Sequence, residues 1–286
     1  MSASSPGVAY AGTHSPRLKA ARRLGKRAFR DRERLFLAEG PQAVGEAFAN
    51  GRGAADGRAT MTDLFVTAAA RSKHGDLVDA IGAANVPVHL VNDAVMSELA
   101  QTVTPQGLLA VCGFVDVTLS AAITERARLV AILANVRDPG NAGTVLRAAD
   151  AAGADAVVFA DASVDPYNGK CVRASAGSLF HLPVVAGARL SDAISQLHQA
   201  GLRVVAADGQ AGRSLDEPDV QERLSKPTAW LFGNEAWGLP PELVALADEA
   251  VAVPIYGKAE SLNLATAAAV CLYASARAQR ATDSMP

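Results

Sequence analysis

Hydrophobic residues in this chain alternate between short continuous apolar runs and longer amphipathic segments. Residues 129–134 (LVAILA), 156–160 (AVVFA) and 228–232 (TAWLF) are uninterrupted runs, typical of strands buried on both faces of a sheet. Further strands are predicted at residues 182–186, 202–207 and 250–255, and helices at residues 142–152, 170–180, 191–200, 241–247 and 262–280. Strand–helix alternation predicts a parallel sheet with helices on both faces. The segment of residues 208–225 is long and polar, and we expect a linker there.

The first part of the chain repeats this alternation with shorter elements, which predicts a small α/β domain. Strands are expected at residues 34–39, 61–66, 86–91 and 108–115, and helices at residues 16–29, 42–49, 75–83 and 93–99. Near residues 117–126 the pattern loosens into Thr, Ser and Ala with scattered charge, which predicts a domain boundary. We therefore expect an N-terminal domain at residues 1–118 and a C-terminal domain at residues 125–286.

Composition and charge fit a folded chain with one unusual region. The 286 residues are 50% hydrophobic and 20% charged, which is globular and sufficient for two domains. The net charge of −2 does not by itself indicate a nucleic-acid-binding protein. Residues 17–34 are strongly basic, however, and two interpretations stay open: a solvated surface helix, or a helix that contacts RNA phosphates. The candidate RNA contacts are Arg22, Arg23, Lys26, Arg27 and Arg30.

Cysteine and histidine usage gives no indication of a metal or disulfide site. Cys112, Cys171 and Cys271 are far apart and form no C-x-x-C pair, and the five histidines lack metal-ligand spacing. The N-terminus lacks the apolar core of a signal peptide, and no apolar run is long enough to cross a bilayer. We expect a reduced, cytoplasmic protein without a bound metal.

Three loops at predicted strand ends carry unusual polar residues: residues 135–141, 233–239 and 255–261. Ligands of parallel sheets bind outside the carboxyl ends of the strands, so these loops predict one pocket. A dinucleotide-binding fingerprint is absent, because the first strand is followed by residues 138–143 (DPGNAG). No phosphate-binding P-loop or G-x-S-x-G hydrolase elbow is found either.

Individual residues of these loops also have purely structural interpretations. Asn141 and Ser261 could each cap the helix that follows. Arg147 could be an ordinary surface arginine and Glu235 a loop carboxylate near a helix start. Taken together, these interpretations would require several polar groups to gather at neighbouring strand ends by coincidence.

Three segments, in order, carry a resemblance to a known family: residues 138–147 (DPGNAGTVLR), 231–239 (LFGNEAWGL) and 253–265 (VPIYGKAESLNLA). Jointly they resemble the SpoU (TrmH) class of RNA ribose 2′-O-methyltransferases, in the knotted SPOUT superfamily. Residues 36–41 (FLAEGP) and 104–107 (TPQG) resemble the small ribosomal-protein-like substrate-binding extension of that family. The combined motifs cover the whole C-terminal domain, and the weaker match covers most of the rest.

The resemblance implies a fold and a cofactor. The fold would be a C-terminal parallel-sheet SPOUT domain with a deep trefoil knot, preceded by the small α/β substrate-binding domain. S-adenosylmethionine would sit against the second and third loops, and members of this class are typically homodimers. By motif position, its contacts would come from Gly233, Asn234, Val253, Ile255, Leu262 and Asn263.

The resemblance also implies the roles of the polar residues in methyl transfer to a ribose 2′-hydroxyl. Arg147 would be the central catalytic residue and Asn141 would position the substrate. Glu235 and Ser261 would order the loops or hold Arg147, and Asn263 would support the pocket. Because arginine stays protonated, we favour a role in which Arg147 binds the target phosphate and stabilises the developing alkoxide, while the phosphate or a water takes the proton.

The RNA target is the least determined part of the prediction. The N-terminal extension favours a structured RNA, and by resemblance 23S (large-subunit) rRNA over tRNA. A catalytically inactive RNA-binding module and a dinucleotide-dependent oxidoreductase are kept as alternatives. The intact motifs disfavour the first and the absent fingerprint disfavours the second.

Overall fold

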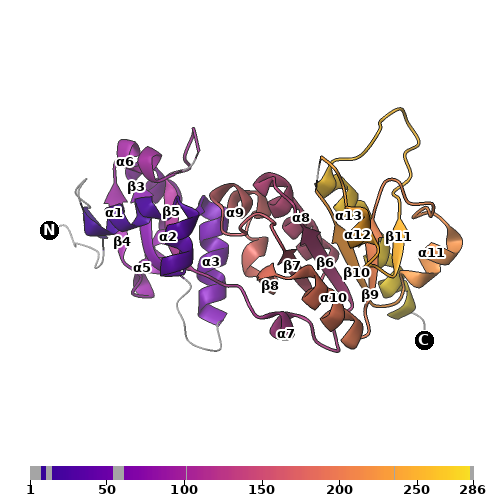
Figure 1. The fold of residues 1–286 in the computed structure, drawn as a ribbon. Helices are drawn as coiled ribbons and strands as arrows, with labels where there is room; N and C mark the ends of the chain where they lie inside the picture. Colours follow the sequence, from indigo (N-terminus) through magenta and orange to yellow (C-terminus); the bar gives the residue numbers. More distant parts are fainter. Residues whose placement is uncertain (1–7, 11–14, 54–60, 101, 235, 284–286) are drawn as a thin grey trace. The chain divides into compact units, whose positions relative to one another are not determined.

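The computed structural model describes residues 8–10, 15–53, 61–100, 102–234 and 236–283, which form two compact units (Figure 1). The first unit comprises Met1–Val115 and Tyr167–Phe180, and the second comprises Asp116–Pro166 and His181–Pro286. The segment Tyr167–Phe180 therefore belongs to the first unit, although it follows strands of the second. The domain bounds expected from the sequence, residues 1–118 and 125–286, stay a prediction.

The first unit is built on a five-stranded sheet with strand order β1-β4-β3-β5-β2. Its strands are β1 (Val8–Tyr10), β2 (Leu35–Glu39), β3 (Met61–Thr67), β4 (Val88–Val91) and β5 (Leu108–Gly113). Its helices are α1 (Pro16–Arg23), α2 (Arg27–Glu33), α3 (Pro41–Gly53), α4 (Ala68–Lys73), α5 (Gly75–Ala83), α6 (Asp93–Leu99), α9 (Gly169–Ser175) and the 3-10 turn η1 (Ser178–Phe180). β1, β4 and β3 run parallel, whereas β5 is antiparallel to both β3 and β2.

The basic segment forms two helices, not the single helix predicted for residues 16–29. α1 ends at Arg23 and α2 begins at Arg27, so the chain breaks around Gly25. Leu18 and Ala21 of α1 are buried against Met96 of α6 in the core of this unit. The break lets α1 keep its apolar face in the core while α2 packs beside β2.

The second unit is a six-stranded parallel sheet with strand order β11-β9-β10-β6-β7-β8. Its strands are β6 (Leu129–Ala134), β7 (Ala156–Ala160), β8 (Val184–Ala188), β9 (Arg203–Ala207), β10 (Thr228–Phe232) and β11 (Glu249–Val251). Its helices are α7 (Leu119–Ala122), α8 (Pro139–Ala152), α10 (Leu190–Gln199), α11 (Pro218–Arg223), α12 (Pro241–Val244) and α13 (Leu264–Asp283). The predicted parallel α/β fold is confirmed, and all six carboxyl ends lie at one edge of the sheet.

Helices cover both faces of this sheet. Leu231 of β10 packs in a core cluster with Ile194 and Leu197 of α10. The side chain of Trp230, its neighbour, points to the opposite face because successive strand residues alternate. There Trp230 is fully buried and its Nε1 donates to Ser275 Oγ of α13 at 2.9 Å. The result is a three-layer α/β/α arrangement.

The C-terminal helix α13 runs beside α8 in the same direction. At one end, Asn263 Nδ2 donates to Asn141 Oδ1 at 3.0 Å. Near the other end, the hydroxyl of Tyr273 donates to the carbonyl oxygen of Ala151 at 3.2 Å. This packing brings the end of the third loop to the first turn of α8.

Three other elements differ from the expectation. The polar stretch 208–225 contains α11, which begins with Pro218 at its first turn. The helix predicted at residues 170–180 ends at Ser175, because Ala176 and Gly177 adopt left-handed conformations, with φ values of 49° and 99°. β11 ends at Val251, short of the predicted residue 255.

The thiols of Cys112 and Cys271 should be unreactive in the folded chain. Burial raises the pKa of Cys271 to about 12, and burial also raises the pKa of Cys112. Because the thiolate is the reactive species, we expect no labelling of either residue by iodoacetamide at neutral pH. Mass spectrometry should find both labelled after unfolding in guanidinium. Rapid labelling of Cys112 or Cys271 in the native protein would contradict this packing.

Candidate functional site

The first loop leads into α8, whose start is fixed by Asp138. The carboxylate of Asp138 accepts a hydrogen bond from the backbone N–H of Asn141 at 2.7 Å, and Pro139 occupies the first turn. This is the residue order that helix starts favour. The interpretation of Asn141 as the cap is therefore wrong. Its side chain instead meets Asn263 of the third loop.

Arg147 lies about two turns along α8, on the side of the helix that faces solvent. Asn141, Thr144 and Arg147 are spaced by three residues, and Thr144 and Arg147 are exposed whereas Val145 and Leu146 are buried. Six residues of helix place Arg147 about 9 Å along the axis from Asn141. Arg147 forms no hydrogen bond or ion pair with any residue in the described ranges, so its guanidinium can accept an anionic ligand.

The second loop is a tight turn after β10. The backbones of Asn234 and Gly238 exchange two hydrogen bonds of 3.0 and 2.9 Å, and Asn234 Oδ1 accepts from the Ala236 N–H at 2.8 Å. A Cβ at Gly233 would lie 2.5 Å from the Gly238 carbonyl oxygen and 2.7 Å from Leu239 Cγ. Only glycine lets the chain enter this turn without pushing it open.

The first and second loops are joined directly. Asn234 is only 6% exposed, and its Nδ2 donates to the backbone carbonyl oxygen of Asn135 at 2.9 Å. Asn135 follows β6 and adopts a left-handed conformation, with φ of 57°, which asparagine tolerates better than most residues. β6 and β10 are neighbours in the sheet, so the hydrogen bond fixes two adjacent carboxyl ends.

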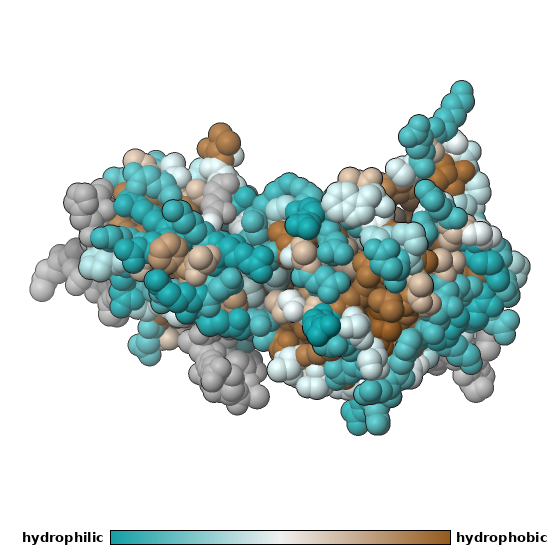
Figure 2. Space-filling model, in the orientation of Figure 1, coloured by the Kyte–Doolittle hydropathy of each residue, from teal (hydrophilic) through white to brown (hydrophobic). Residues whose placement is uncertain are grey.

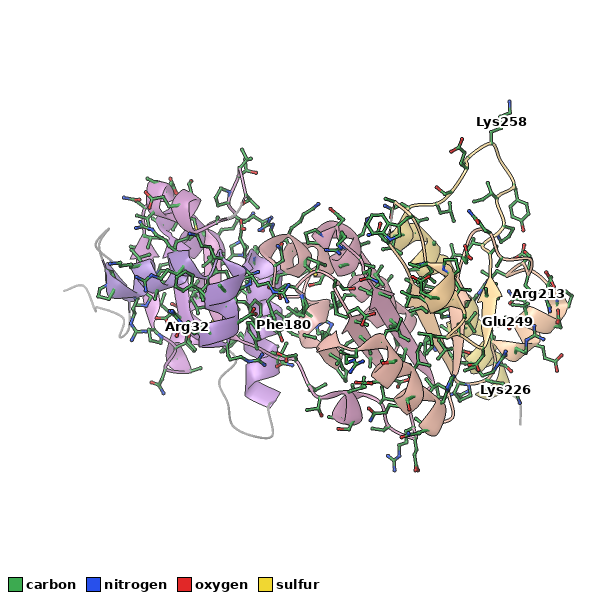
Figure 3. All side chains as sticks on the ribbon, viewed as in Figure 1. Arg32, Phe180, Arg213, Lys226, Glu249 and Lys258 are labelled. Carbon is green, nitrogen blue, oxygen red and sulfur yellow. The ribbon has the colours of Figure 1, made fainter. Side chains whose placement is uncertain are left out.

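The third loop leaves β11 and returns to α13. Val253 is half-buried, but Ile255 and Leu262 are 38% and 36% exposed. Lys258 marks its outer end in Figure 3 and points away from the second unit. The returning end is fixed by Asn263, whose Oδ1 accepts from the backbone N–H groups of Ala265 and Thr266.

Asn263, not Ser261, therefore caps the last helix, so the interpretation of Ser261 as the cap is wrong. Ser261 is exposed and bonds to no residue that the structure describes. Glu235 lies outside the described residues, and its prediction is not addressed by the structure. The structure joins Asn141 with Asn263, and Asn135 with Asn234. Arg147 lies on α8, the helix that carries Asn141 in its first turn.

The outgoing half of the third loop has a second attachment, which the sequence did not reveal. The Tyr256 hydroxyl donates to Asp216, and this hydrogen bond raises the pKa of Tyr256. Asp216 precedes α11, and Arg223 of α11 bonds to Glu249 of β11 at 2.8 Å. Arg213, labelled near Glu249 in Figure 3, joins the same charged group. Pro218 inside the polar stretch was the available signal for this helix.

The second and third loops offer apolar surface to a ligand. Ile255 and Leu262 are exposed apolar side chains, which a ligand would cover. Among the described residues, no cluster of His, Cys, Asp and Glu could hold a metal ion. None of the helices described has the length and apolar character needed to cross a membrane.

The basic helices of the first unit present most, but not all, of the predicted RNA contacts. Arg22, Arg23, Lys26 and Arg27 are exposed, and the face around α1 and α2 is mainly hydrophilic in Figure 2. Arg30 is only 4% exposed, and its Nη1 donates to the carbonyl oxygens of Leu24 and Gly25 at 3.0 and 3.1 Å. The prediction that Arg30 contacts RNA is corrected, because its guanidinium closes the α1–α2 break.

Alanine variants should separate these two kinds of arginine. Arg30→Ala removes the donor to the buried carbonyl of Leu24 and to the part-buried carbonyl of Gly25, and we expect it to lower the free energy of unfolding by about 1–3 kcal/mol. Arg27→Ala should leave stability unchanged, because its ion pair with Asp31 is exposed. It should weaken RNA binding and reduce the salt dependence of binding by roughly one counterion. Urea unfolding and RNA titration at several salt concentrations measure both effects, and a stable Arg30→Ala protein would contradict the assignment.

Two family descriptions match the chain in separate regions. Residues 128–273 match the SpoU rRNA Methylase family. Residues 15–110 match the MRM3-like substrate binding domain. The first match includes all three loops, and the second includes the basic helices and residues 104–107.

Several proteins are similar along much of their length. The chain is 38% identical to the 23S rRNA (guanosine(2553)-2′-O)-methyltransferase RlmP of Bacillus subtilis over 66% of this chain and 72% of that protein. It is 34% identical to an uncharacterised tRNA/rRNA methyltransferase of Synechocystis, over 95% and 94% of the two chains. An rRNA methyltransferase from Sinorhizobium meliloti, solved with bound AdoMet, superposes with a TM-score of 0.77 at 31% identity, covering 94% and 97%.

Proposed function

The chain belongs to the SpoU rRNA methylase family, and we propose that it methylates a ribose 2′-hydroxyl of 23S rRNA with S-adenosylmethionine as methyl donor. The observation that carries the proposal is the joining of the three family motifs at one sheet edge, through the Asn141–Asn263 and Asn234–Asn135 hydrogen bonds. Relatives named as 23S rRNA 2′-O-methyltransferases support the choice of RNA.

The proposed cofactor site uses the second and third loops. Its residues are Gly233, Asn234, Val253, Ile255, Leu262 and Asn263. When bound, S-adenosylmethionine supplies an electrophilic methyl group on a sulfonium. Gly233 and Asn234 offer a rigid turn whose backbone can approach a ligand closely, and the apolar side chains of the third loop exclude water. Structures of similar proteins with bound AdoMet support the choice of this cofactor.

The ribose hydroxyl is a weak nucleophile at neutral pH, so the protein must stabilise the negative charge that develops on its oxygen. In the proposed mechanism, the Arg147 guanidinium binds the phosphate beside the target ribose and lies close to that oxygen. A phosphate oxygen or a water accepts the proton, because arginine is a poor base. Asn141, held by Asn263, positions the ribose. Glu235 and Ser261 are proposed to order the loops around Arg147.

We also propose that the protein is a homodimer and that its C-terminal segment is threaded as a knot. Val270 and Tyr273 of α13 are 40% and 44% exposed, and a second copy could cover these apolar side chains. The basic residues Arg22, Arg23, Lys26 and Arg27 are proposed to contact RNA phosphates. The cytoplasm stays the predicted location.

Mapping of 2′-O-methyl groups in a deletion strain tests the RNA target. We expect one 23S rRNA nucleotide to lose its methyl group and to regain it when the wild-type gene is restored, but not with Arg147→Ala. Loss of a tRNA methyl group instead would establish the tRNA alternative. Unchanged methylation in both RNAs would favour an inactive RNA-binding module.

A further inference from the structure

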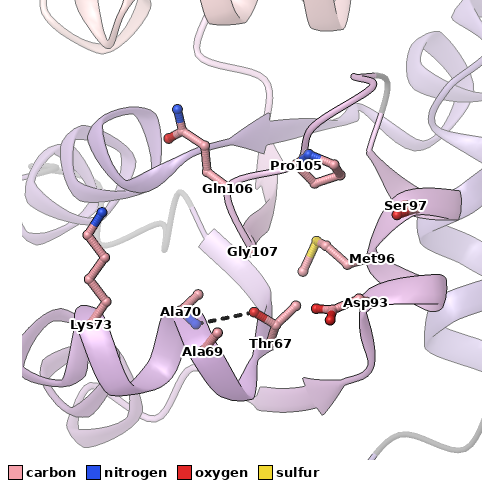
Figure 4. Close-up of a pocket in the computed structure, with 10 residues that line it drawn as sticks. All are labelled: Thr67, Ala69, Ala70, Lys73, Asp93, Met96, Ser97, Pro105, Gln106 and Gly107. Carbon is pink, nitrogen blue, oxygen red and sulfur yellow. Dashed lines mark hydrogen bonds between the residues drawn. The ribbon is translucent and has the colours of Figure 1, made fainter.

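A cavity of about 290 Å³ lies in the first unit, whereas the three motif loops belong to the second (Figure 4). It opens where the parallel strands β3 and β4 end, between α4, α6 and the turn before β5. Its volume is at the lower end for small-molecule sites, so it suits one small ring system. All of its lining residues fall within residues 15–110, the region that matches a substrate-binding domain.

The walls of the cavity are fixed by contacts within the unit. Thr67 donates its backbone N–H to the Gly107 carbonyl oxygen at 2.9 Å, and its Oγ1 accepts from the Ala70 N–H at 3.2 Å. Gly107 has φ of 79°, and a Cβ there would lie 2.5 Å from Thr67 Oγ1. Glycine therefore lets the turn approach α4 closely. These contacts hold the walls in place, which lowers the cost of ordering them on binding.

The lining combines apolar side chains with one positive and one negative side chain. Met96, 1% exposed, and Pro105 form the apolar part of the lining, as Figure 4 shows. Lys73, Asp93 and Gln106 lie around the opening. In the described part of the chain, neither Lys73 nor Asp93 has a hydrogen-bond or ion-pair partner. A carboxylate disfavours a phosphate group, whereas a nucleobase edge carries both donors and acceptors that these side chains can satisfy.

We propose that this cavity binds one unpaired nucleobase of the RNA substrate. The inference rests on the proposed function, because it requires an RNA ligand. Proteins recognise RNA sequence mainly through unpaired bases, which they stack on side chains and hydrogen-bond at the edges. The segment beside the cavity supports such a contact. Val103 is 100% exposed there, next to Thr102, whose hydroxyl donates to Glu39 at 2.5 Å. An anchored loop thus presents an apolar side chain that can pack against the neighbouring base.

Two alanines on α4 provide a matched test. Ala68 and Ala69 are both exposed, but only Ala69 lines the cavity. Ala69→Leu fills the cavity and Ala68→Leu does not, with the same change in helix propensity and volume. The full-length proteins are titrated with an RNA hairpin that carries one bulged adenosine and with the same hairpin without the bulge. S-adenosylmethionine is omitted, so that binding is read independently of methyl transfer.

We expect the wild-type chain and Ala68→Leu to bind the bulged hairpin roughly fivefold to 100-fold more tightly, the range for one base edge held by side-chain hydrogen bonds. Ala69→Leu should bind both hairpins equally. Lys73→Ala should weaken both and reduce the salt dependence of binding. Equal binding of the two hairpins by the wild-type chain, or a bulge preference that persists in Ala69→Leu, would overturn the inference. Methyl transfer to rRNA, measured in parallel, reports on the proposed function separately: its absence would reject that function whatever the hairpins show.

Discussion

Replacement of Arg147 by alanine is expected to lower the rate of methyl transfer by roughly 100- to 1,000-fold, the cost of removing one donor to a developing oxyanion. Arg147 is exposed on α8 and bonds to nothing in the described structure, so its loss should not unfold the protein. It belongs to neither cofactor loop, so the affinity for S-adenosylmethionine should stay the same. Single-turnover methylation and isothermal titration measure the two quantities.

Two variants make this prediction specific. Arg147→Lys keeps the charge but loses the planar fork, so its rate should lie between those of the wild type and Arg147→Ala. Arg126→Ala removes another exposed arginine of the second unit and should have no effect. Near-wild-type methylation by Arg147→Ala with normal cofactor binding would reject the proposed role of the guanidinium.

Replacement of Gly233 by alanine is expected to weaken cofactor binding at least tenfold. The new Cβ would lie 2.5 and 2.6 Å from backbone atoms of Gly238, which cannot rotate away as a side chain could. Opening the turn costs about 1–3 kcal/mol and breaks the backbone pair between Asn234 and Gly238. We expect at least a tenfold weaker affinity, about 1.4 kcal/mol, for S-adenosylmethionine.

Gly257→Ala is the matched control for this change. Gly257 lies in the third loop, and a Cβ there meets no atom within 4 Å. Its affinity for S-adenosylmethionine should equal that of the wild type. If Gly233→Ala binds the cofactor as tightly as Gly257→Ala, the second loop does not hold the cofactor.

Three of the six strands of the second unit were predictable to the residue, because a continuous apolar run indicates a buried strand without reference to the rest of the fold. β6, β7 and β10 begin and end where their apolar runs do. α11 was missed because Val220 is its single buried apolar residue, and the helix is held by charged partners such as Glu249 of β11. A helix stabilised by such tertiary ion pairs has no apolar periodicity to reveal it.

The site could be predicted as a set of motifs but not as a set of contacts. Asn141 and Asn263 are 122 residues apart, and only the packing of α13 along α8 brings them to 3.0 Å. Arg30 shows that a charged residue can be wrongly predicted as exposed. It sits in a basic segment with exposed neighbours, yet carbonyl oxygens five and six residues before it bind its guanidinium in the interior. Charge pattern alone cannot distinguish a buried arginine from its exposed neighbours.

The most direct measurement uses the purified full-length chain, S-adenosylmethionine labelled in its methyl group, and unmodified 23S rRNA. The RNA is digested to nucleosides and the position of the label is determined by mass spectrometry. We predict label on the 2′-oxygen of one ribose, and none when Arg147→Ala replaces the wild type. Label on a base, or no label in rRNA under conditions where the cofactor binds, would contradict the proposed function.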